Sequence, residues 1–80
     1  MPSVALNKAL KVLPAEPRLR IRVALAFRDL TQSALASATD ITAPKISNAM
    51  NGYVVLTDDE QAAVARVLDA PRDLLFPEAA

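Results

Sequence analysis

The stretch LTQSALASATDITAPKISNAMNG, residues 30–52, decides the fold, because it holds the signals for two short helices joined by a tight turn. Thr31 is a typical N-cap, since its hydroxyl can accept a hydrogen bond from a backbone amide of the first turn. The first helix should end near Asp40, a residue type that tolerates the left-handed backbone conformation of such a turn. Thr42 then caps the second helix, Pro44 fits its first turn, where a missing amide costs nothing, and Asn51-Gly52 is typical of a helix end.

The sequence before this stretch predicts two more helices. Ser3 is a candidate cap for a first helix that Pro14 would end, and its apolar residues recur at helical spacing, namely Leu6, Leu10 and Leu13. Pro17 suits the first position of the next helix. We expect the apolar stripe of that helix to consist of Leu19, Val23, Ala26, Phe27 and Leu30.

The sequence after it also predicts helix. Thr57 and Glu60 have the spacing of a capping box, in which each side chain accepts from the backbone amide of the other residue. The helix that they open should end before Pro71, and a final turn over 72–76 should return apolar residues to the core. One glycine and no strictly alternating β-branched run give little support for a sheet. The expected fold is all-α, a compact bundle of about five short helices with an additional N-terminal helix.

Length and composition narrow the function. The 80 residues suffice for one domain, which we divide into an N-terminal helical extension (1–16), a helical domain (17–77) with its helix pair at 31–52, and a tail (78–80). The absence of cysteine and histidine removes disulfides, thiol nucleophiles, imidazole bases and the common zinc ligands. No nucleophile with a base and no carboxylate pair at useful spacing emerges, so we expect neither an enzyme nor a metal or cofactor site.

The net charge is zero, but its distribution is uneven. Residues 1–50 carry seven basic and three acidic side chains, and residues 51–80 carry two basic and six acidic ones. Such asymmetry suits a surface that faces a polyanion, although two halves that attract each other would show it too. Lys8 and Lys11 interrupt the N-terminal apolar pattern, unlike a signal peptide, and no apolar stretch reaches the ~20 residues of a membrane span. We expect no membrane contact and a cytoplasmic location, at the bacterial nucleoid or in a phage-infected host.

Residues from about 19 to 77 resemble the Cro/C1-type repressors, also called the XRE family. The matching residues are Leu30-Thr31-Gln32, Leu35-Ala36, Ile41-Thr42, Ile46-Ser47, Asn51-Gly52, Leu56 to Glu60, Val67-Leu68 and Leu74 to Phe76. The resemblance implies a lambda-repressor-like helix-turn-helix domain, whose second short helix enters the major groove of double-stranded DNA. The chain departs from the family at Asp40, where relatives usually carry glycine, and at Leu25 and Met50, where many relatives pair an arginine with a glutamate.

The resemblance also supplies the register of a DNA interface. The outward positions of the helix predicted at 43–51 would read bases: Ala43, Pro44, Lys45, Ser47 and Asn48. Asn48 can pair with adenine, Lys45 can reach guanine acceptors or a phosphate, and the two residues before Lys45 can touch a thymine methyl. Residues flanking this face would contact phosphates: Gln32, Thr42, Asn51, Gly52, Tyr53 and Arg28. In the family's second clamp, an asparagine side chain and backbone amides after the glycine grip the strand. Each of these positions could instead be ordinary protein surface.

The expected function is that of a sequence-specific transcription regulator, repressor-like, binding a palindromic operator as a homodimer. The alternative is a protein–protein interaction module of the same fold, antitoxin-like or an adaptor, because fold does not fix function and the net charge is zero. Two segments are candidate dimer interfaces, and either could simply cap the core: the N-terminal helix with Leu6, Leu10, Val12 and Leu13, and the turn Leu74-Leu75-Phe76.

Overall fold

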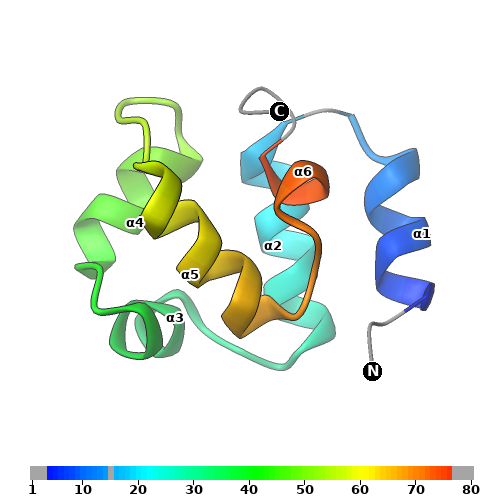
Figure 1. Ribbon diagram of the computed structural model, residues 1–80, viewed down its shortest axis with the longest axis horizontal. Helices are drawn as coiled ribbons and strands as arrows, with labels where there is room; N and C mark the ends of the chain where they lie inside the picture. Colours follow the sequence, from blue (N-terminus) through cyan, green and yellow to red (C-terminus); the bar gives the residue numbers. More distant parts are fainter. Residues whose placement is uncertain (1–3, 15, 77–80) are drawn as a thin grey trace.

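The computed structural model describes residues 4–14 and 16–76, and within these residues it contains helices and no strand (Figure 1). In chain order the helices are α1 (Val4–Val12), α2 (Pro17–Phe27), α3 (Gln32–Thr39), α4 (Ala43–Met50), α5 (Asp58–Leu68) and α6 (Arg72–Leu75). The expected all-α bundle with an additional N-terminal helix is confirmed. No helix in the described part of the chain is long and apolar enough to cross a lipid bilayer.

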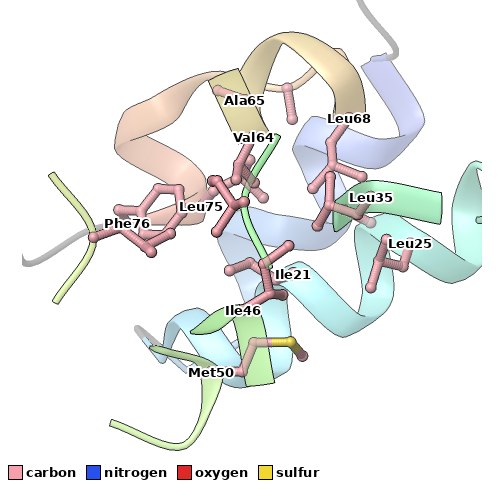
Figure 2. Close-up of a cluster of buried hydrophobic side chains, with 14 of the residues drawn as sticks. Ile21, Leu25, Leu35, Ile46, Met50, Val64, Ala65, Leu68, Leu75 and Phe76 are labelled. Carbon is pink, nitrogen blue, oxygen red and sulfur yellow. The ribbon is translucent and has the colours of Figure 1, made fainter. Parts of the chain in front are cut away.

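One hydrophobic core joins all six helices. Its largest fully buried side chains are Leu6, Leu10, Leu35, Leu68, Leu75 and Val64. Figure 2 shows side chains of α2 to α6 pointing into this common cluster. Burying one side chain of this size stabilises the fold by roughly 1.5–3 kcal/mol. Because these side chains come from helices far apart in the sequence, contacts between distant segments determine the packing.

Helix α1 is an integral part of the core, although the sequence suggested an extension. Leu6 and Leu10 are fully buried, and α1 packs against α2 and α6. The predicted stop at Pro14 agrees with the end of α1 at Val12. The predicted cap Ser3 and the predicted tail 78–80 lie outside the described residues.

The buried face of α2 differs from the predicted stripe. Ala26 and Phe27 are exposed, whereas Ile21, Ala24 and Leu25 are buried. The apolar spacing predicted the position of the helix correctly but assigned its buried face incorrectly. The correct phase was hidden because the buried face also contains an arginine.

That arginine, Arg20, is 7% exposed and ties the chain together. Its guanidinium donates to the carbonyls of Pro14 (3.2 Å) and Leu13 (3.0 Å), which follow α1, and to that of Leu74 (2.8 Å) in α6. A rigid fork of donors can satisfy several carbonyls at once, so carbonyl oxygens stabilise this buried cation.

Several helices end on residues with left-handed backbone. Asp29, Asp40 and Asp69 have φ of 57°, 59° and 51° and follow α2, α3 and α5. The predicted left-handed turn at Asp40 is therefore confirmed. After Asp29 and Asp69, the next amide donates five residues back, from Leu30 to Leu25 and from Ala70 to Ala65, which is the Schellman pattern.

Candidate nucleic-acid interface

Helices α3 and α4 form the expected helix pair. Each has eight residues, and residues 40–42 connect them, so α4 leaves the turn in a different direction from α3 (Figure 1). Thr31 and Thr42 cap the two helices as predicted: their hydroxyls accept from the amides of Ala34 (3.0 Å) and Lys45 (3.3 Å). Both caps span three residues, so local sequence is enough to fix where each helix begins.

The N-terminus of α3 presents free donors. The amides of Gln32 and Ser33 have no partner within the described residues, and neither α3 nor α4 carries an acidic residue in its first turn. The first turn of α5, in contrast, contains Asp58, Asp59 and Glu60. Because a helix N-terminus carries partial positive charge, α3 can bind an anion that the acidic side chains of α5 would repel. Gln32 is half-buried at this point, which is where the phosphate prediction requires it.

The exposed residues of α4 carry no charge. Pro44 and Asn48 are exposed one turn apart, and Asn51 follows on the same side after the helix ends. Ser47 is half-buried beside them. Ala43, which was predicted to face outward, is half-buried and packs against the hydrophobic core. The exposed surface of α4 is therefore narrower than the base-reading face that the sequence predicts, and it includes the side-chain amide of Asn48.

Lys45 does not extend freely from α4. Its Nζ lies 2.7 Å from Oε2 of Glu60, and the two side chains are 43% and 20% exposed. The hydrogen bond from Lys45 is the main cause that lowers the pKa of Glu60, and the bond from the Thr57 amide adds to it. The pair joins residues from two helices, so the sequence pattern of either helix alone did not reveal it.

At the end of α4, the backbone amides that the sequence predicts to hold a phosphate are hydrogen-bonded within the helix end. Gly52 has φ 82°, a conformation that favours glycine, and the amides of Gly52 and Tyr53 donate back to Ala49 (3.2 Å) and Asn48 (2.8 Å). These two amides complete the helix end, so a phosphate contact through them would compete with the bonds to Ala49 and Asn48. The exposed side chains of Asn51 and Tyr53 remain available to a ligand.

Arg28 lies elsewhere, at the C-terminal end of α5. Its guanidinium donates to the carbonyls of Leu68 (2.9 Å) and Asp69 (3.0 Å), and it lies 3.5 Å from the Asp69 carboxylate. These carbonyls close α5, where a cation is favoured by the helix dipole. The phosphate role predicted for Arg28 would require breaking these bonds.

Arg18 lies beside the end of α4. It is exposed at the start of α2 and lines an open cavity of about 540 Å³ together with Asn51 and Gly52. The sequence prediction selected Arg28, which precedes the helix pair along the chain. Packing in addition brings the N-terminus of α2, with Arg18, beside the end of α4.

Apolar side chains are exposed directly after this end. Tyr53 and Val55 are 78% and 87% exposed on the connection between α4 and α5. Among the described residues, no group of acidic side chains is arranged to hold a metal ion. The candidate features are therefore the free amides at the N-terminus of α3, the exposed side chains of α4, and the end of α4 with Arg18 and an apolar loop beside it.

The comparisons with known proteins give no neighbour: no family model matches the chain, and no curated protein or solved structure matches it.

Proposed function

We propose that this protein is a sequence-specific regulator of transcription that binds double-stranded DNA with α4 in the major groove. The observation that carries the proposal is the capped α3–α4 pair, in which Asn48 and Pro44 project from the second helix. An asparagine in the major groove can pair with adenine through two hydrogen bonds. Gln32 and the free amides of α3 would hold a phosphate on one flank, and Asn51 with Arg18 would hold one on the other.

The proposed interface contains few cations, and this limits the expected affinity for DNA and its dependence on salt. Lys45 is the only basic residue between 31 and 52, and each neutralised phosphate contributes about −0.9 to the slope of log K against log salt. A single copy should therefore bind weakly and with a shallow slope. A homodimer on a palindromic operator, in the bacterial nucleoid or an infected host, would double the contacts.

A mobility-shift titration with random duplex at several salt concentrations tests the proposal. We expect a salt-dependent shift that Q32A and N51A weaken, because both side chains are proposed to contact phosphates, while S37A, an exposed position on α3 away from its N-terminus, leaves it unchanged. Circular dichroism of each variant would check that the helices are intact. A protein that gives no shift at low salt, or one that Q32A and N51A leave unaltered, is not a DNA regulator of this kind.

The exposed apolar loop favours a second candidate, a protein-interaction module. Tyr53 and Val55 expose apolar surface that a protein partner would cover. Substituting both with serine separates the candidates. Under the DNA proposal, the double variant loses at most the Tyr53 contact, whereas an interaction module would lose its partner and would show no DNA shift to begin with.

A further inference from the structure

The Lys45–Glu60 ion pair neutralises the one cation of the helix pair. Its two atoms are 2.7 Å apart. Other arginines of the chain are also engaged, since Arg20 and Arg28 bond carbonyls and Arg72 bonds Asp58 and Gln61. The proposed reading surface thus offers DNA a lysine whose charge is already balanced.

Glu60 is held in place by its second role. Its Oε1 accepts from the amide of Thr57 at 2.9 Å, while its own amide donates to Oγ1 of Thr57 at 3.2 Å, so the capping box is complete. One carboxylate oxygen therefore fixes the start of α5, and the other faces Lys45. The carboxylate cannot turn away from Lys45 without breaking the cap, and its lowered pKa keeps it ionised at neutral pH.

We propose that Glu60 restrains DNA binding by competing with phosphate and guanine for Lys45. This inference rests on the proposed function, and it adds a determinant of affinity that lies outside the reading helix. A phosphate or base can engage Lys45 only when the lysine leaves Glu60, so the Coulomb gain of the new contact is offset by the lost one. Binding to random DNA depends almost entirely on such phosphate contacts. Glu60 should therefore weaken binding to random DNA more than binding to a specific operator.

The variant E60Q removes the competing charge and keeps the cap, since glutamine also fills this position of a capping box. The matched control is D59N, which changes the net charge equally in the same helical turn but has no contact with Lys45. Both variants are titrated with fluorescently labelled random duplex by anisotropy at several salt concentrations. Urea unfolding of both variants confirms that each is folded.

We expect E60Q to bind about two- to five-fold tighter than D59N, the range set by a partly exposed ion pair. We expect its salt slope to be steeper by about 0.9, the value of one more phosphate contact. In a K45A background, E60Q and D59N should bind equally, because no lysine remains to be released. The cycle thereby isolates the pair from the general effect of charge.

The outcomes distinguish the two proposals. Salt-dependent binding that E60Q and D59N raise equally overturns the restraint by Glu60 and leaves the DNA-binding function standing. A difference between them that persists in the K45A background also overturns it, because the effect would not pass through Lys45. Absence of binding by the wild type and by both variants at low salt overturns the proposed function and the restraint together.

Discussion

At the scale of single residues, Arg20 shows how a buried charge can organise a small core. Its three hydrogen bonds reach the connection after α1 and the carbonyl of Leu74 in α6, 54 residues further along the chain. No pattern around residue 20 indicates these partners, since the sequence shows one of three arginines spaced two apart. Its neighbours Arg18 and Arg22 are exposed. Which arginine is structural is decided by the positions of distant carbonyls.

We expect R20M to lower the free energy of unfolding by about 1.5–3 kcal/mol, because carbonyls buried with the guanidinium lose a charged donor. R22M, on the exposed side of the same helix, should change it by less than about 0.5 kcal/mol. Urea denaturation followed by circular dichroism measures both values. Equal effects of the two substitutions would show that the bonds of Arg20 do not stabilise the fold.

Asp40 is another residue where two effects can be separated. It closes α3 with φ 59° and is exposed, so its negative charge lies at the end of a helix whose dipole disfavours it. The sequence indicated the left-handed turn correctly, because Asp is one of the few side chains that tolerate it. Glycine is therefore not required at this turn.

We expect D40N to raise the free energy of unfolding by about 0.3–1 kcal/mol, since asparagine keeps the left-handed conformation and removes the charge. D59N, at the opposite end of a helix in the first turn of α5, should lower it by a similar amount. Thermal unfolding of both proteins at low ionic strength provides the test. A shift of the same sign in both would contradict the dipole argument, because the two substitutions change the net charge identically.

At the scale of elements, the helix boundaries were the predictable part of the structure. Thr31, Thr42 and Thr57 each cap a helix through a bond that spans three residues, so the information is local. The phase of α2 was not predictable in this way, because Arg20 occupies its buried face and Phe27 its exposed face. The spacing of apolar residues therefore predicts the position of α2 but not which of its faces is buried.

In the candidate site, too, features within one helix were predictable and contacts between helices were not. Exposure of Pro44 and Asn48 followed from helical spacing. The engagement of Lys45 by Glu60, the bonds of Arg28 to α5 and the proximity of Arg18 to Asn51 are contacts between elements. Such contacts depend on how α2, α4 and α5 pack, which periodicity within one helix does not specify.

At the scale of the whole molecule, α1 completes the core. Leu6, Leu10 and Leu75 are fully buried, and Phe76 is nearly so. Most of the residues predicted for a dimer interface therefore pack within one chain. Val12 is the exception, at 81% exposed. A homodimer would have to use this outer face of α1 or another exposed surface.

We expect L10A to lower the free energy of unfolding by about 2–5 kcal/mol, the usual cost of a cavity at a fully buried leucine. In a domain of this size that is a large part of the total stability. V12A, on the exposed side of α1, should stay within about 0.5 kcal/mol of the wild type. Chemical denaturation gives both values, and a mild effect of L10A would mean that α1 is peripheral to the core.

An amide chemical-shift map of the ¹⁵N-labelled protein titrated with a short random duplex at low salt tests most directly whether the α3–α4 pair faces DNA. The largest shifts should fall on Gln32, Ser33, the amides of α4 around Asn48, and Asn51, while the amides of α1 remain still. Shifts confined to α1 or to the exposed loop at 53–55, or no shifts at all, would show that the α3–α4 pair does not face DNA.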